Sequence, residues 1–227
     1  MRGLDGSTLW EYRPHPGLPP DSLDPADLDG DGRVEFYAAS AEAIARLDAA
    51  GREIWRQPAT LADLAAVIPR AQGQPGWVVG VEYGVRAIVC DDAGALLGTL
   101  PLPSGVMATA ADYAGERLLI VADRTVRGLA LNGALRVEIP LDDFTATQVL
   151  GIRLTPGASS SLVIVGATDR DARRWRVLIV DAGRRVVYDE VADAYPRVFV
   201  ARGAAGRDVL FVATASILRK LSPRADS

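Results

Sequence analysis

The sequence of 227 residues contains one cysteine, one histidine and one lysine. A lone cysteine, Cys90, cannot form a disulfide within the chain, and its apolar surroundings in the sequence indicate a small core residue. The lone histidine, His15, lies in the proline-rich segment "RPHPGLPP" with no histidine or cysteine nearby, which indicates a solvated loop residue. These scarcities exclude an internally disulfide-bonded scaffold and argue against zinc or histidine chemistry.

The sequence also has little net charge and lacks long apolar runs. The formal net charge is −4, so no basic surface for nucleic acid is expected. No apolar run approaches the ~20 residues of a transmembrane helix, and we expect no membrane insertion. The opening residues "MRGLDGSTLWEYRP" lack the apolar segment of a secretory leader. We therefore expect either a cytoplasmic protein or a domain excised from a longer chain, and we favour excision because a strand pattern begins almost at Met1.

What the sequence does contain is a repeat. Five segments share an apolar strand, a turn of Asp, Asn or Gly, and a second strand: "LDGSTLWEYR" (4–13), "LDAAGREIWR" (47–56), "CDDAGALLGT" (90–99), "LNGALRVEIP" (131–140) and "VDAGRRVVYD" (180–189). Asp, Asn and Gly suit such turns because short hairpins need residues that tolerate positive φ. Taking the first turn residues as Asp5, Asp48, Asp91, Asn132 and Asp181, the spacings are 43, 43, 41 and 49 residues.

Each repeat also contains two strands upstream of its hairpin, of which the second is strongly apolar, as in "LLIVA" and "LVIVG". Even the alanine-rich stretch 38–48, which has helix-forming composition, is predicted to be a turn and a strand because the other copies are β there. Four strands every ~40–45 residues are typical of a β-propeller blade. We predict an all-β, five-bladed propeller of four-stranded antiparallel blades in one domain, with blades at about 22–58, 63–101, 105–140, 145–190, and 195–222 completed by 4–13.

The last of these blades is predicted to close the ring. The strand at 7–13 has no inner partners of its own, and the inner strands ending at 217–222 have no outer one. Pairing the two would remove an open sheet edge. The alternatives are an arc cut from a longer propeller and pairing between separate chains.

A candidate metal loop lies in the first full blade, at "DLDGDGRVEF". Asp27, Asp29 and Asp31 occupy alternate positions, and the backbone carbonyl of Arg33 and the side chain of Glu35 continue the series. Hard divalent cations such as Ca²⁺ take six to eight oxygen ligands, which alternate residues around a glycine-rich turn can supply. Mg²⁺ fits less well because it prefers a stricter octahedron with retained waters. We predict that Ca²⁺ ties the end of one strand to the start of the next.

This loop resembles the calcium loop of the FG-GAP/VCBS repeat family, which includes the integrin α-like propellers. An EF-hand would need a glutamate at position 12, where this sequence has Ala38. Corresponding stretches elsewhere keep fewer acids, Asp112 and Glu116 in one and Asp208 in another, so metal binding is not extended to them. The hairpin "LDAAGREIW" has a weaker similarity to pyrroloquinoline-quinone-like propeller repeats. The main resemblance implies an extracytoplasmic setting and protein or glycan partners.

We therefore expect a non-catalytic, calcium-binding interaction module, either monomeric or part of a larger chain. No nucleophile elbow, phosphate loop or dinucleotide fingerprint is present, so no catalytic residue is assigned. Two alternatives stay open: an enzyme that resembles the polysaccharide lyase or quinoprotein propellers, and a structural spacer of a larger surface protein. The insertion "DRDARRWR" (169–176) is the best candidate for a partner contact, and Trp10 and Trp55 are predicted to pack between blades.

Overall fold

The structure is a computed structural model, and it describes residues 7–14, 22–70, 74–155, 159–169, 174–202, 208–214 and 218–221. These residues form nineteen strands and no helix. Consequently, the described part of the chain contains no helical segment able to span a membrane. The chain divides into two compact units, Met1–Ala108 and Thr109–Ser227.

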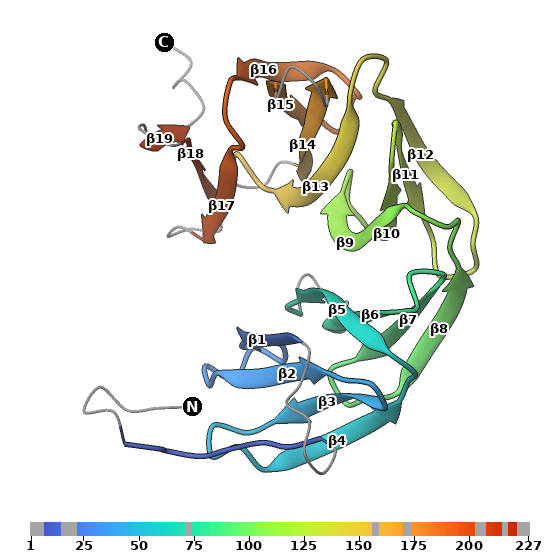
Figure 1. Ribbon diagram of the computed structural model, residues 1–227, viewed down its shortest axis with the longest axis vertical. Coiled ribbons are helices and arrows are strands. Elements are labelled where there is room, and N and C mark those ends of the chain that lie inside the picture. Colours follow the sequence, from blue (N-terminus) through green and yellow to red (C-terminus); the bar gives the residue numbers. More distant parts are fainter. Residues whose placement is uncertain are drawn as a thin grey trace. The chain divides into compact units, whose positions relative to one another are not determined.

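The first unit contains two four-stranded antiparallel sheets, each with its strands in chain order (Figure 1). The first sheet is β1–β4 and the second is β5–β8. Their bounds are β1 Ser22–Ala26, β2 Glu35–Ala39, β3 Ala43–Leu47, β4 Glu53–Pro58, β5 Ala62–Ile68, β6 Trp77–Glu82, β7 Arg86–Asp91 and β8 Leu96–Pro101.

The second unit begins inside β9 and holds two more four-stranded antiparallel sheets and a sheet with three described strands. These sheets are β9–β12, β13–β16 and β17–β19. Their bounds are β9 Met107–Tyr113, β10 Glu116–Ala122, β11 Thr125–Leu129, β12 Leu135–Pro140, β13 Thr145–Ile152, β14 Ser161–Asp169, β15 Arg174–Val180, β16 Val186–Ala192, β17 Arg197–Arg202, β18 Asp208–Ala213 and β19 Leu218–Leu221.

Burial differs between the middle and the outer strands of each sheet. All residues of β2 and β3 are buried, whereas β4 is exposed or half-buried throughout. Middle strands have neighbours on both edges and both faces, which is why their sequences are continuously apolar or small. The alanine-rich stretch 38–48 therefore forms the end of β2, a turn and β3, as predicted from the repeat.

The sheets pack face to face within each unit. In the first unit, Tyr37 and Ile44 of the first sheet share a buried cluster with Val78, Ile88 and Cys90 of the second. In the second unit, residues of β14 and β15 such as Val163 and Val177 form a cluster with Val198, Leu210 and Val212 of β17 and β18. The hydrophobic core of each unit therefore lies between sheets of that unit.

The hairpin between the third and fourth strands of each four-stranded sheet uses one turn geometry. The first turn residue donates its N–H to the carbonyl four residues later, and its own carbonyl accepts the N–H three residues later. The fourth position has positive φ and is occupied by Gly51, Gly94, Gly133 and Arg184. By this criterion the third of these turns starts at Ala130, so aligning Asn132 with Asp48 was wrong by two positions. The error arose because the Asn132 side chain accepts from the amide of Ala134, as turn-capping residues do.

The all-β prediction is confirmed, and the four-stranded antiparallel sheets follow one another like the blades of a propeller. The number of five blades, their union in one domain and closure of the ring stay predictions. Residues 7–14 contain no strand, and residues 4–6 and parts of the expected final blade lie outside the described residues.

Candidate metal centre

The acidic loop (residues 27–34) connects β1 to β2. Gly30 and Gly32 have φ of 80° and 85°, a region that residues with a Cβ rarely adopt. This conformation turns two backbone amides toward the first aspartate of the loop. Asp27 accepts hydrogen bonds from the N–H of Gly30 at 2.8 Å and of Gly32 at 3.1 Å. The glycines thus fold the loop around the Asp27 carboxylate.

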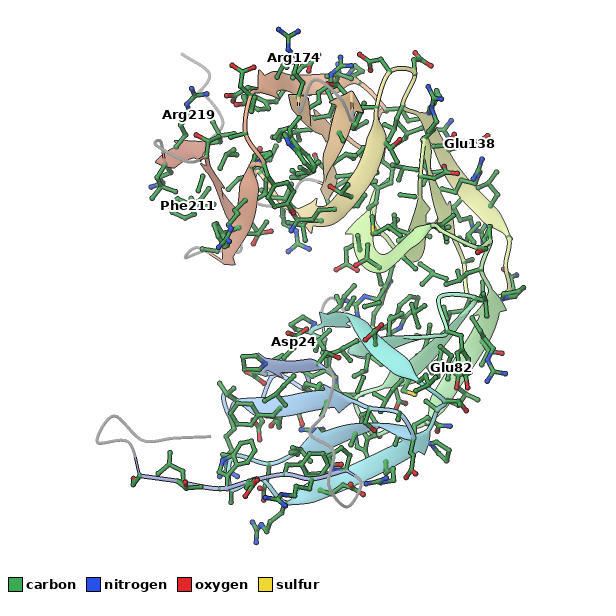
Figure 2. All side chains as sticks on the ribbon, in the orientation of Figure 1. Asp24, Glu82, Glu138, Arg174, Phe211 and Arg219 are labelled. Atoms are coloured by element: carbon green, nitrogen blue, oxygen red, sulfur yellow. The ribbon has the colours of Figure 1, made fainter. Side chains whose placement is uncertain are left out.

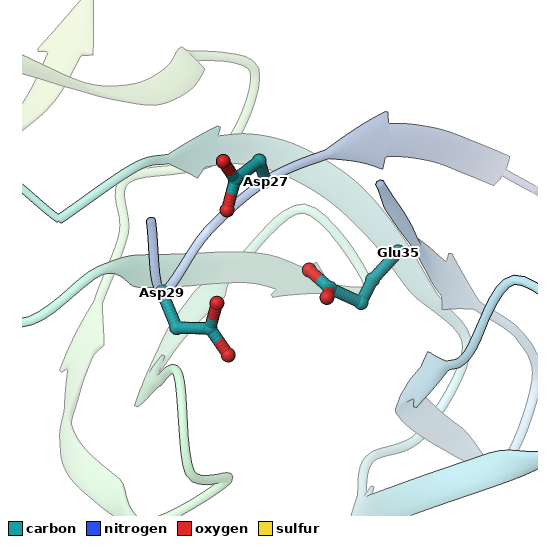
Figure 3. Close-up of side chains that lie close together, drawn as sticks. All are labelled: Asp27, Asp29 and Glu35. Carbon is teal, nitrogen blue, oxygen red and sulfur yellow. The ribbon is translucent and has the colours of Figure 1, made fainter. Parts of the chain in front are cut away.

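Three side chains form the acidic cluster: Asp27, Asp29 and Glu35 (Figure 3). One carboxylate oxygen from each lies within 4.8 Å of the others, and no further group of three or more potential ligands occurs in the described part of the chain. Glu35 is the first residue of β2 and is 5% exposed. Its Oε2 atom is buried and has no hydrogen-bond partner, which is costly for a carboxylate unless a cation or water reaches it.

The structure brings together three of the five predicted ligand residues. Asp31 is exposed, lies outside the acidic cluster and accepts the N–H of Arg33 at 2.8 Å. Asp29 in turn accepts the N–H of Asp31 at 3.3 Å. Coordination by the side chain of Asp31 and by the carbonyl of Arg33 stays a prediction.

Sequence reasoning missed Arg46, which reaches the acidic cluster from β3. Its Nη2 atom lies 2.6 Å from Asp29 Oδ2 and 3.1 Å from Glu35 Oε1, and its side chain is 10% exposed. The hydrogen bond from Arg46 lowers the pKa of Asp29, so that carboxylate is ionised at neutral pH. A signal was present in the sequence, because an arginine in the otherwise apolar strand "AIARL" needs a buried partner.

Arg46 also joins the first sheet to the second. Its Nη1 atom donates to the backbone carbonyl of Asp92 at 2.8 Å, and the indole Nε1 of Trp55 donates to the same carbonyl at 3.2 Å. The carboxylate of Asp92 pairs with the guanidinium of Arg70. The backbone N–H of Arg70 in turn donates to the carbonyl of Leu28 in the acidic loop. The acidic cluster is therefore connected to the second sheet twice, through Arg46 and through the acidic loop at Leu28.

The charges around the acidic cluster do not cancel. Three carboxylates face the guanidinium of Arg46, and the next guanidinium, that of Arg70, is paired with Asp92, which leaves two formal negative charges in a partly buried place. Carboxylates held this close repel one another unless a cation is present. An oxygen-only set of ligands with a double negative charge fits a hard divalent cation such as Ca²⁺.

The prediction that Trp55 packs between sheets is confirmed, and Trp10 makes a similar contact with the first sheet. Trp55 packs against Tyr37, with ring centroids 6.3 Å apart, and against the turn at Gly94, where an added Cβ would lie 2.7 Å from the indole. Trp10 packs edge-on against Phe36 at 5.1 Å and covers the turn at Gly51 in the same way. In both cases a tryptophan ring covers the glycine of a hairpin turn: Trp10 of segment 7–14 covers a turn of the first sheet, and Trp55 of β4 covers a turn of the second.

The remaining sequence candidates have simpler surroundings. Cys90 is fully buried, and burial raises the pKa of its thiol to about 11, as suits a core residue. His15 and residues 170–173 of the insertion lie outside the described residues. At the end of the insertion, Arg176 pairs with Asp143 and Asp189 and lies 5.6 Å over the ring of Phe144.

A surface pocket of about 420 Å³ lies at one end of the second sheet. Its floor contains Glu82, labelled in Figure 2, whose side chain is 4% exposed and pairs with Arg86. Glu82 also accepts the N–H of Thr60 at 2.7 Å. Tyr83 on the rim is 61% exposed, and its φ of 50° belongs to the tight hairpin turn that it forms with Gly84 between β6 and β7. The pocket volume is within the range of small-ligand sites.

Comparison with solved structures supports the propeller-like arrangement. The chain is similar to BBS1N as crystallised with ARL6DN, at 12% identity and a TM-score of 0.68, over 92% of this chain and 68% of that one. It is also similar to a protein of unknown function from Bacteroides caccae, at 15% identity and a TM-score of 0.56, over 92% and 76%. BamB from Moraxella catarrhalis matches at 18% identity and a TM-score of 0.52, over 89% and 60%.

These likenesses concern the fold alone, because every identity is low. Among them, the BBS1N and BamB structures are β-propellers, which agrees with the sheets described above. No family model matches the sequence, and no curated protein matches it.

Proposed function

We propose that the chain is a calcium-binding β-propeller that acts as a non-catalytic module for binding a protein or glycan. The observation that carries the calcium assignment is the charge around the acidic cluster, where three carboxylates face one guanidinium and Glu35 Oε2 is buried without a partner. The similarity of the loop to FG-GAP/VCBS repeats supports the same ion and an extracytoplasmic location, where calcium loops of moderate affinity suit the available concentration.

In this proposal the ion stabilises the fold. Asp27, Asp29 and Glu35 would hold it, with Asp31 and the carbonyl of Arg33 completing the oxygen set. Bound Ca²⁺ supplies two positive charges that offset the mutual repulsion of these carboxylates. Because protein oxygens would fill most of its coordination, little room is left for a ligand on the ion.

Removal of calcium tests this proposal. An ion present at about 100 times its dissociation constant stabilises the folded state by about 2.7 kcal/mol. For a protein of this size, adding a chelator should then lower the melting temperature by about 5–10 °C, measured by differential scanning calorimetry. The double variant Asp29→Ala, Asp31→Ala should show no such shift, whereas Asp63→Ala, which removes an exposed acid from β5, should keep it. Equal shifts in the wild type and the double variant would remove the calcium assignment.

The surface pocket favours a binding module over a spacer. A pocket that joins an exposed aromatic ring, Tyr83, to the ion pair of Glu82 and Arg86 offers apolar contact and hydrogen bonding in one place. A lyase-like or quinoprotein-like enzyme is the second candidate class, although no described residue is assigned a catalytic role. A spacer function would be favoured if Tyr83→Ala and Arg86→Ala changed no binding property of the protein.

We further propose closure as a five-bladed ring, in which residues 4–13 supply the outer strand of the last blade. The support is the packing of Trp10, which covers Gly51 as Trp55 of the outer strand β4 covers Gly94. Deleting residues 1–13 should expose a sheet edge and the face around Phe36, causing aggregation in size-exclusion chromatography. A truncated protein as soluble and stable as the full chain would contradict closure.

A further inference from the structure

Arg46 occupies an unusual position because its guanidinium contacts candidate calcium ligands and the neighbouring sheet at once. Nη2 lies within hydrogen-bond distance of Asp29 Oδ2 and Glu35 Oε1, while Nη1 donates to the carbonyl of Asp92. The planar guanidinium carries its donors in a rigid fork, so a change at one nitrogen reorients the others. No other described arginine pairs with two members of the acidic cluster.

The carboxylate oxygens divide between this arginine and the rest of the cluster. Arg46 takes one oxygen of Asp29 and one of Glu35. The second oxygen of Glu35 is buried and has no partner, and Figure 3 shows its carboxylate directed toward Asp27 and Asp29. Arg46 therefore fixes the orientation of two ligands and leaves the other Glu35 oxygen for an ion.

The far side of the contact provides a spectroscopic reporter. The Asp92 carbonyl that accepts from Arg46 also accepts from the indole N–H of Trp55. Trp55 is one of four tryptophans, and its ring packs between the two sheets. Any change in the hydrogen bond from Arg46 to this carbonyl should alter the indole N–H of Trp55.

We propose that Arg46 is a positioning residue that couples calcium binding at the acidic cluster to the packing of the first sheet against the second. The inference rests on the proposed calcium site and adds what the ion controls. When a cation draws charge from Asp29 and Glu35, their hydrogen bonds to Arg46 weaken, and the guanidinium strengthens its bond to the Asp92 carbonyl. The ion then stabilises an interface between sheets as well as a loop.

The positive charge of Arg46 has a second consequence, which concerns the calcium affinity of the site. Arg46 contributes one positive charge close to a divalent cation, and this repulsion outweighs the help it gives by orienting two ligands. Replacing Arg46 with methionine should therefore tighten calcium binding by about tenfold while abolishing the response at Trp55. A residue with a merely structural role would weaken both properties together.

The experiment is a titration of the full chain with CaCl₂, followed by nuclear magnetic resonance of the backbone amides and tryptophan indoles and by calorimetry. In the wild type, the amides of Gly30 and Gly32 should shift because the ion binds, and the indole of Trp55, assigned with Trp55→Phe, should shift with the same midpoint. In Arg46→Met, the glycine amides should still shift and the Trp55 indole should not. Arg46→Lys keeps the charge but cannot reach all three acceptors, so its affinity should stay near that of the wild type with the Trp55 response lost.

Arg117→Met is the matched control, because it removes another buried arginine that pairs with an aspartate at a connection between the first and second strands of a sheet. It should leave both responses unchanged. A Trp55 shift of equal size in Arg46→Met and wild type would overturn the coupling, as would a wild type in which the glycine amides respond and Trp55 does not. If calcium shifts no amide of the acidic loop in the wild type, the proposed calcium site fails and the coupling fails with it.

Discussion

The connection between β1 and β2 and the connection between β9 and β10 both carry acidic residues, but they pair these acids with arginines in different ways. Between β1 and β2, an eight-residue loop brings three carboxylates to one arginine. Between β9 and β10, a two-residue turn at Ala114 and Gly115 is flanked by two carboxylates, Asp112 and Glu116. Arg117 pairs with Asp112 through two hydrogen bonds of 2.8 and 3.2 Å, and its side chain is 2% exposed.

The difference shows that the same place in a sheet, between its first and second strands, does not by itself gather an uncompensated group of acids. Each acid at the second connection has its own arginine, because Asp112 pairs with Arg117 and Glu116 pairs with Arg136, so their formal charges cancel. The acidic cluster retains two negative charges after Arg46 is counted, and its Glu35 has an unpaired buried oxygen. If the proposed calcium site is correct, the number of acids relative to arginines distinguishes the connection that binds a cation from the one that does not.

The largest expected effect comes from removing each arginine in the absence of calcium. Arg46→Met leaves Glu35, at 5% exposure, as an uncompensated buried charge and should lower the free energy of unfolding by about 3–5 kcal/mol. Arg117→Met leaves Asp112, whose side chain is 28% exposed and can hydrate, so about 1–2 kcal/mol is expected. Urea unfolding in a chelator measures both. Equal losses would mean that the burial of the acid does not distinguish the two connections.

The hairpin turns extend the comparison to the backbone. Gly51 has a φ of 76°, and an added Cβ would meet the ring of Trp10 at 2.6 Å, so Gly51→Ala should destabilise the protein by about 2 kcal/mol. In the second unit Arg184 occupies the same turn position with a φ of 63°, and Arg184→Gly should stabilise the protein by about 1 kcal/mol. Thermal unfolding should show shifts of opposite sign. A loss of stability in Arg184→Gly would indicate a contact of its side chain that outweighs the backbone strain.

The smallest effect is expected at the more exposed ion pair between Arg176 and Asp189, which contrasts with the buried contacts of Arg46. A hydrogen bond from Arg176 lowers the pKa of Asp189 below its usual value of 3.8. A carboxylate with a lowered pKa stabilises the fold above pH 3.8, and the contribution is lost as the pH falls through the folded-state pKa. Because Asp189 is 42% exposed, Asp189→Asn should cost only about 0.5–1 kcal/mol at neutral pH.

That difference between Asp189→Asn and the wild type should shrink as the pH falls below 3.8 and disappear once the wild-type carboxyl is protonated in the folded state. Urea unfolding across the pH range measures it, and 1 M salt at neutral pH should reduce it further. A difference that persists unchanged at low pH would show that packing of the side chain, and not its charge, stabilises this region.

Much of this architecture could be predicted from the repeat. Strands such as Glu116–Ala122 were visible as apolar runs, and the turn residues Asp48, Asp91 and Asp181 were correctly aligned. The alignment failed at Asn132, because both the first and the third residue of such a turn can cap it, and the sequence does not distinguish them. Turn-capping side chains contact backbone groups only a few residues away, which is why the turns could be predicted from the sequence.

For the same reason, only part of the candidate site could be predicted from the sequence. Asp27, Asp29 and Glu35 stand within nine residues, so their proximity follows from the chain. Arg46 reaches them from another strand, and its partner Asp92 lies in the second sheet. Contacts between strands depend on register, which a pattern of apolar residues constrains only to one face or the other.

By itself, the sequence determined the strand order, the turn chemistry and the concentration of acid in residues 27–35, because each follows from local conformational preference and spacing. Only the tertiary structure decided which acids converge, that Arg46 offsets part of their charge, and that the cluster is tied to the second sheet. The physical reason is that charge balance in a buried place depends on every group within a few ångströms, including those contributed by distant parts of the chain.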